Sequence, residues 1–206
     1  VILDHYELDI AWEKCIRTRS NKILVIEDFL GRRHSADYVL GSSLKLKNES
    51  YFEEPAATAF LLGQEYIILD KDFSRERIGP LPALRNRMLL FFGSADLTGE
   101  TEKVLRALKE HDDLTIDRIS AVHVVLGVCN KAASRIERLL SALPSPRLSI
   151  QLGSLSAAIK EADLFFTAGG NAMVEGVALG KACIVISTAE NQADLCKEFA
   201  ALPYVL

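Results

Sequence analysis

A chain of 206 residues exceeds the usual size of one domain, so it can form one large domain or two smaller ones. Apolar residues make up 49% of the chain and charged residues 25%, a balance that excludes intrinsic disorder and provides for a sizeable core. The formal charge of -4, without a block of Lys or Arg, leaves no basic surface for nucleic acid or anionic lipid.

The chain carries no sequence signal for metal, membrane or export. Its four cysteines form no C-x-x-C pair, so we expect reduced thiols and no metal site. No apolar run approaches the ~18–20 residues of a membrane span, and no signal peptide pattern is present, which predicts a cytoplasmic protein. Residues 1–3 open inside an apolar run without Met, so we interpret the chain as part of a longer protein.

Apolar runs of strand length recur along the chain, with helical spacing between them. Continuous hydrophobicity is typical of strands that are covered on both faces, and the alternation of strand and helix predicts an α/β fold with parallel sheets of βαβ units. Strands are expected at residues 1–4, 22–27, 38–40, 87–92, 121–126, 148–152, 164–167 and 182–187. Helices are expected at residues 9–18, 100–109, 131–143, 155–162, 172–179 and 193–201.

The least regular part of the chain lies between residues 45 and 82, where Pro55, Pro80 and Pro82 stand among charged residues. Polar stretches that contain proline typically join domains. We therefore predict an incomplete first domain over residues 1–81 and a nearly whole second domain over residues 82–206.

Two loops that follow predicted strands contain candidate site residues. His5 and Tyr6 follow the first strand, where a ligand site is expected in a parallel sheet, although a lone histidine is more often structural. Gly93 and Ser94 follow the strand at 87–92 and can approach a phosphate; alternatively, Asp96 or Thr98 caps the next helix.

The segment at residues 168–175 is the most informative candidate. Gly169 and Gly170 follow a strand and allow close approach of a ligand, while the start of the next helix offers unpaired N–H groups and a positive dipole end to a diphosphate. Glu175 lies four residues after Asn171, on the same helix face, where its carboxylate can accept hydrogen bonds from two ribose hydroxyls. The alternative is a helix capped by Asn171 with a solvated Glu175.

A second polar cluster follows the strand at 182–187 and consists of Glu190, Asn191 and Gln192. Both clusters come after the carboxyl ends of strands, so we expect them to face one crevice, although an acidic helix start is also ordinary. No dinucleotide fingerprint, P-loop, H-E-x-x-H or G-x-S-x-G motif occurs, so no cofactor is expected. His34, His111 and His123 have no partner at metal spacing and are given no role.

Several segments in this order resemble a known family: the D-H-Y motif with Trp12 and Glu13, then residues 23–28, 61–66, 92–98 and 168–192. They are similar to the UDP-2,4-diacetamido-2,4,6-trideoxy-β-L-altropyranose hydrolases of pseudaminic acid synthesis and to the spore-coat polysaccharide proteins. Both groups look like relatives of the MurG-type glycosyltransferases with the GT-B fold. The resemblance implies two Rossmann-like domains, of which the C-terminal one holds UDP.

The resemblance also implies roles for residues of this chain. Those expected at the diphosphate are Gly169, Gly170 and Asn171, with Glu175 at the ribose and Glu190, Asn191 and Gln192 at diphosphate or sugar. The loop from Gly153 to Leu155 meets the uracil through its backbone, and Tyr6, His5 and Asp4 line the sugar side. The family's glycine-rich loop with its catalytic histidine has no counterpart here, and the residue after the later glycine pair is Asn171 instead of Ser or Thr.

These implications give a function hypothesis with two alternatives. The favoured one is hydrolysis of a UDP-linked amino-deoxy sugar to free sugar and UDP in nonulosonic acid or surface polysaccharide biosynthesis. A glycosyltransferase that uses a UDP-sugar donor is the second, and a non-catalytic nucleotide-sugar-binding module is the third. UDP or a UDP-sugar is the expected partner in all three, and the resemblance places the catalytic histidine outside this chain.

Overall fold

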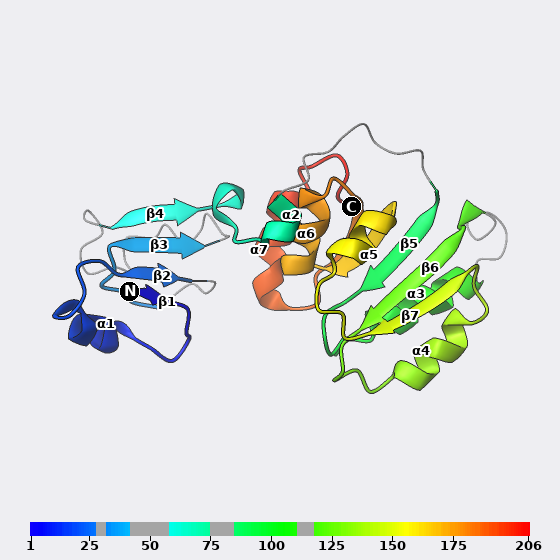
Figure 1. Cartoon of the computed structure of the whole chain (residues 1–206), viewed down its shortest axis with the longest axis horizontal. Coiled ribbons are helices and arrows are strands. Elements are labelled where there is room, and N and C mark those ends of the chain that lie inside the picture. Colours follow the sequence, from blue (N-terminus) through cyan, green and yellow to red (C-terminus); the bar gives the residue numbers. More distant parts are fainter. Residues whose placement is uncertain (28–31, 42–57, 75–84, 111–117) are drawn as a thin grey trace. The chain divides into compact units, whose positions relative to one another are not determined.

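The computed structural model describes residues 1–27, 32–41, 58–74, 85–110 and 118–206. Contacts divide the chain into two compact units, Val1–Ile68 and Leu69–Leu206, each built around its own parallel sheet (Figure 1). The predicted α/β class with two parallel sheets is confirmed. The predicted domain boundary between residues 81 and 82 lies outside the described residues.

The first unit is a four-stranded parallel sheet with one helix, in the strand order β1-β2-β3-β4. Asp9 caps the helix by accepting hydrogen bonds from the N–H groups of Ala11 and Trp12 at 3.0 and 3.1 Å. Trp12 and Ile16 then pack from the helix onto the buried Ile23 and Val25. The elements are β1 (Ile2–Leu3), α1 (Ile10–Arg17), β2 (Leu24–Ile26), β3 (Tyr38–Gly41), β4 (Ala59–Leu62) and the 3-10 helix η4 (Gln64–Tyr66).

Three short elements of the described residues, β4, η4 and α2 (Lys71–Ser74), lie in the region that the sequence pattern marks as irregular. Strand β4 was not predicted, because its four residues are only partly buried and it pairs on one side, with β3. Its strand conformation therefore depends on that pairing more than on its own sequence. Helix α2 is a single turn that packs against α6 (Asn171–Ala178), so the second unit includes it.

The second unit is a five-stranded parallel sheet in the order β7-β6-β5-β8-β9. Met88 and Leu90 face the core that α3 and α4 cover, whereas Leu89 between them is fully buried on the opposite face. Both faces of the central strand are thus covered, as its continuous hydrophobicity predicts. The strands are β5 (Arg87–Phe91), β6 (Ala121–Leu126), β7 (Pro146–Ile150), β8 (Leu164–Ala168) and β9 (Ala182–Ile186). The remaining helices are α3 (Glu100–Glu110), α4 (Ala133–Leu140), α5 (Ser156–Glu161), η6 (Glu190–Gln192) and α7 (Ala193–Phe199).

The last residues of the chain extend this sheet beyond β9. The N–H of Cys183 donates to the carbonyl of Tyr204 at 2.8 Å, and the N–H of Leu206 donates to the carbonyl of Cys183 at 2.9 Å. Cys183 and Val205 form a parallel bridge. Among the described residues no helix has the length and apolar character needed to cross a membrane.

Candidate functional site

The strand order of the second unit creates a topological switch point between β5 and β8. From β5 the chain proceeds outward through β6 and β7, then returns to the other side of β5 to form β8 and β9. Because every strand is parallel, the loops after β5, β8 and β9 leave from one edge of the sheet. Open α/β sheets bind ligands in the crevice at this edge, next to the switch point.

Helix α6 begins at this edge without a side-chain cap. Gly170 is its N-cap, and no side chain accepts a hydrogen bond from the first turn. Asn171 is the first helical residue and is exposed, so the alternative in which Asn171 caps the helix is wrong. In the described part of the chain the N–H groups of Asn171 and Ala172 have no hydrogen-bond partner, because only that of Met173 bonds back to Gly170. Two free donors at the positive end of a helix dipole form a favourable place for an anion.

The two polar clusters predicted around α6 and η6 lie against each other. A Cβ atom added at Gly169 would lie 2.1 Å from the Sγ of Cys196 and 3.3 Å from the Cβ of Gln192. A Cβ at Gly170 would lie 3.9 Å from the Nε2 of Gln192. A side chain at position 169 would therefore require Cys196 to move, and Gln192 presents its amide nitrogen to the start of α6. Cys196 was not expected to pack here, because the sequence gives no signal for that contact.

The amide of Gln192 is held in this orientation by Thr188. Its Oε1 accepts hydrogen bonds from the N–H of Thr188 at 2.9 Å and from the hydroxyl of Thr188 at 3.1 Å. With the oxygen occupied, the Nε2 group is the part of the side chain that remains available as a donor. Glu190 and Asn191, the other two predicted residues of this cluster, are exposed in η6.

Glu175 lies one turn after Asn171 and is partly buried, so it is not a fully solvated residue. Burial raises the pKa of its carboxyl above the usual range, and the charge of Asp70 acts in the same direction. Within the described residues the carboxylate makes no hydrogen bond. A partly desolvated carboxylate without partners can accept two hydrogen bonds from a bound group that carries adjacent hydroxyls.

The loop after β5 reaches the same edge, but the N–H groups at the start of the following helix, α3, already have a hydrogen-bond partner in this loop. The carboxylate of Asp96 accepts hydrogen bonds from the N–H groups of Glu100 at 2.8 Å and Thr101 at 3.0 Å, so the alternative in which Asp96 caps α3 is confirmed. Gly93 has a φ of 87°, which favours glycine. Ser94 is exposed, and its backbone leaves no room for a side chain at Gly127.

The loop after β7 exposes its backbone. Gly153 and Ser154 are exposed, and a Cβ atom at Gly153 would meet no atom within 4 Å. Leu155 precedes α5, and the N–H of Ser156 donates to the hydroxyl of Ser154 at 3.2 Å. This loop is therefore exposed, and its contact with a uracil base stays a prediction.

His5 and Tyr6 lie in the first unit, in the loop between β1 and α1, and both are exposed. The N–H of Glu7 donates to the Nδ1 of His5 at 3.1 Å. Because Nδ1 accepts this hydrogen bond, the neutral imidazole carries its proton on Nε2. His5 in this state is a hydrogen-bond donor to a ligand, and acting as a base through Nε2 requires the loss of that bond.

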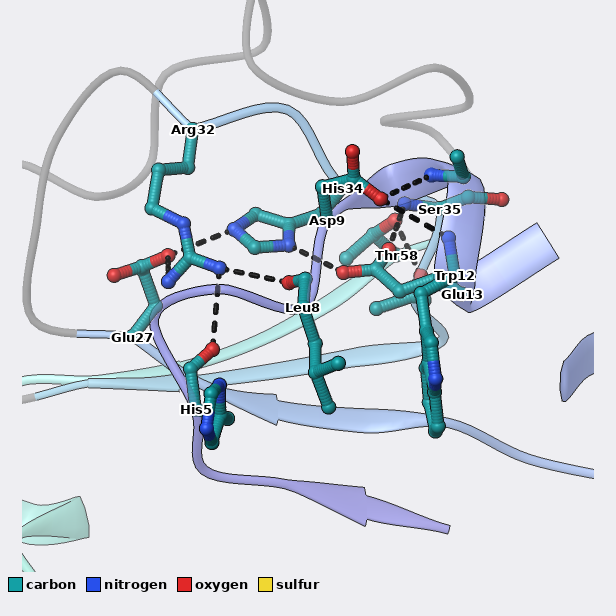
Figure 2. Close-up of polar contacts among 12 residues, drawn as sticks. His5, Leu8, Asp9, Trp12, Glu13, Glu27, Arg32, His34, Ser35 and Thr58 are labelled. Carbon is teal, nitrogen blue, oxygen red and sulfur yellow. Dashed lines mark hydrogen bonds and ion pairs between the residues drawn. The ribbon is translucent and has the colours of Figure 1, made fainter. Parts of the chain in front are cut away.

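A buried polar cluster in the first unit was not predicted from the sequence. His34, which is 2% exposed, lies between Glu13 at 2.7 Å and Glu27 at 2.9 Å (Figure 2). Burial disfavours the imidazolium, but the hydrogen bonds and charges of the two carboxylates outweigh this effect and raise the pKa of His34 to about 9. The available signal was Glu27 at the end of a buried-type strand, because a buried carboxylate needs a partner. The described residues contain no group of ligands that could hold a metal ion.

Comparisons with known proteins agree with this architecture. No family model matches the chain. It is 27% identical to an uncharacterised protein of Methanocaldococcus jannaschii over 209 residues, covering 97% of this chain and 42% of the relative. It is 26% identical to the spore coat polysaccharide biosynthesis protein SpsG of Bacillus subtilis over 192 residues, which cover 91% of this chain and 55% of SpsG. The chain thus spans about half the length of the curated relatives it matches.

The fold also matches a solved crystal structure. The crystal structure of Acinetobacter baumannii MurG superposes with a TM-score of 0.58 at 17% identity, over 98% of this chain and 57% of that one. The chain is therefore a distant homologue of SpsG, and its two parallel α/β units match the fold of MurG-like GT-B proteins, as expected.

Proposed function

We propose that this chain binds a UDP-linked amino-deoxy sugar and belongs to an enzyme that hydrolyses it to free sugar and UDP in nonulosonic acid or surface polysaccharide biosynthesis. The observation that carries the proposal is the uncapped start of α6, placed at the carboxyl end of β8 with Gln192 beside it and Glu175 one turn further on. The homology to SpsG supports a role in polysaccharide biosynthesis.

In this proposal the start of α6 holds the diphosphate. The N–H groups of Asn171 and Ala172 donate to its oxygens, and the absence of a side chain at Gly170 permits close approach. The Nε2 of Gln192 adds a donor from the next loop. These donors also stabilise the charge that develops on the departing diphosphate when the bond to the sugar breaks.

Glu175 is proposed to bind the ribose. Its carboxylate accepts hydrogen bonds from the two adjacent hydroxyls, which replace water at a group that is already partly desolvated. The backbone of residues 153–155 is proposed to recognise the uracil. His5 and Tyr6 are proposed to contact the sugar, with His5 donating from Nε2.

The first test is nucleotide binding. Calorimetric titration of the 206-residue protein with UDP, ADP and GDP is expected to give the highest affinity for UDP. Glu175→Ala is expected to weaken UDP binding by about 1.5–3 kcal/mol, the usual contribution of hydrogen bonds to a charged acceptor, and Glu175→Gln by less. Glu137→Ala, at an exposed position of α4, serves as the matched control.

Two results would contradict the assignment. Equal heats for all three nucleotides would remove UDP as the ligand. Parent-like UDP binding by both Glu175 variants, with unchanged melting, would make Glu175 an ordinary helix residue. Release of UDP from a UDP-linked diacetamido sugar, measured with and without a sugar acceptor, then distinguishes hydrolysis from glycosyl transfer.

A further inference from the structure

The loop that carries His5 and Tyr6 is anchored by one arginine, Arg32. The guanidinium of Arg32 donates through NH2 to the carbonyl of Leu8 at 2.9 Å and to that of His5 at 3.3 Å (Figure 2). Its NH1 group lies 3.1 Å from Oε2 of Glu27. The planar fork of arginine therefore joins two backbone points of this loop to a buried carboxylate, which a single ammonium group cannot do.

The carboxylate that orients Arg32 is itself fixed. Oε2 of Glu27 also forms a hydrogen bond with Nε2 of His34, and Nδ1 of His34 forms one with the carboxylate of Glu13 in α1. Carboxylates only accept hydrogen bonds, so both ring nitrogens of His34 are donors and the ring is protonated. The Glu13, Glu27 and His34 side chains are no more than 3% exposed, and Arg32 is 23% exposed.

This arrangement resists movement because its charged groups are paired where they are buried. Among the described residues, two carboxylates face one imidazolium and one guanidinium, so displacing a member leaves a buried charge without that partner, which is strongly unfavourable. Asp9, at the far end of the loop, is fixed separately as the cap of α1. The loop is thus held at its middle and at its end, while His5 and Tyr6 remain exposed on it.

We propose that Arg32 is a positioning residue, which holds the loop of His5 and Tyr6 in the conformation that meets the sugar. The inference rests on the proposed function for the identity of the ligand and for the contact of His5 and Tyr6 with the sugar. Arg32 acts through the carbonyl groups of His5 and Leu8 and does not touch the substrate. A preorganised loop loses less conformational freedom on binding, so it should raise the affinity for the UDP-sugar without changing the affinity for UDP alone.

Hydrogen exchange measures the anchoring directly. In Arg32→Lys the charge opposite Glu27 is kept but the fork is lost, so we expect amide exchange in residues 5–9 about tenfold faster, the effect of one lost hydrogen bond. Exchange in β2 and β3 is expected to stay unchanged. Arg33→Lys, at the neighbouring exposed position, is the matched control and should leave residues 5–9 as in the parent. Unchanged exchange at residues 5–9 in Arg32→Lys would overturn the proposal, and so would equally faster exchange throughout β2 and β3.

Binding measurements then connect the anchor to the ligand. UDP affinity is expected to be unchanged in Arg32→Lys, whereas the ratio of UDP-sugar affinity to UDP affinity should fall about five- to tenfold. Faster local exchange with an unchanged ratio would refute the positioning role. A parent protein that binds neither UDP nor UDP-sugar would instead refute the proposed function, and the exchange experiment would still decide whether Arg32 anchors the loop.

Discussion

Because His34 is buried between two carboxylates, we expect the first unit to lose stability as the pH becomes alkaline. Its pKa is about 9 in the folded protein because the carboxylates of Glu13 and Glu27 outweigh the cost of burial, whereas an unfolded histidine has a pKa near 6.5. The stabilisation is fully present below pH 6.5 and is lost as the pH rises through about 9, because the folded state retains a proton that the unfolded state has released. A gap of about 2.5 in pKa corresponds to about 3 kcal/mol of unfolding free energy.

The chain provides its own probe for this measurement. Trp12 is the single tryptophan, and it packs against the core of the first unit, so its fluorescence reports the unfolding of that unit. Urea unfolding followed by Trp12 fluorescence at pH 6, 7.5 and 10 should show the free energy falling by about 3 kcal/mol across this range. The variant His34→Gln should be less stable at pH 6 and should lack most of this dependence.

Two outcomes would refute this explanation. One is an unfolding free energy that stays constant between pH 6 and 10 in the parent, and the other is an equal fall in His34→Gln. Should the variant fail to fold, the NMR titration of the His34 ring in the parent gives the same information. A midpoint near 6.5 would then show that Glu13 and Glu27 do not hold the proton.

Further predictions concern the second unit. Burial, with a smaller effect of Arg147, lowers the pKa of His123 to about 4, so the unfolded chain binds this proton first and the unit should lose up to about 3 kcal/mol as pH falls from 6.5 to 4. Hydrogen exchange of β6 should show this loss, and His123→Gln should remove it; equal loss in both proteins would contradict the prediction. Gly169→Ala forces a methyl group against Cys196 and should lower the unfolding free energy by about 1–3 kcal/mol. It should also weaken UDP binding. Gly153→Ala enters open space and should keep the melting temperature; parent-like melting and UDP binding by Gly169→Ala would show that this contact is not tight.

Much of the fold could be predicted from the sequence because buried parallel strands need uninterrupted apolar runs. Strand β8 was predicted at residues 164–167 and is found at Leu164–Ala168, and α6 was predicted at residues 172–179 and is found at Asn171–Ala178. Strand β4 could not be found in this way. Its four residues are partly exposed, and its pairing with β3 is a tertiary interaction that no local pattern records.

The candidate site was predictable to the level of the sheet edge and no further. The alternation of strand and helix predicts parallel strands, so the loops after strands could be assigned to one edge, whereas the strand order could not be predicted. Whether a helix start offers free donors depends on the side chain that reaches it, and the sequence left open whether Asp96 or Thr98 caps one helix and Asn171 the other. The cluster around His34 was invisible for a related reason: Glu13 and Glu27 become its partners only when α1 and β2 are packed together.

The contrast between α3 and α6 provides the last prediction. Both helices start at the same sheet edge. The carboxylate of Asp96 accepts hydrogen bonds from the first N–H groups of α3, whereas Gly170 has no side chain that could cap those of α6. Gly170 has an extended backbone with a φ of -114°, and a Cβ there meets Gln192 only at 3.9 Å, so an aspartate fits at this position. Gly170→Asp should therefore cap α6 and stabilise the unit by a few tenths of a kcal/mol, the usual difference between aspartate and glycine at this position, while its carboxylate occupies the amides proposed for the diphosphate and strongly weakens UDP binding. Thermal melting and UDP titration of the same variant test both effects. Higher stability with parent-like UDP affinity would show that the diphosphate does not bind at this helix start.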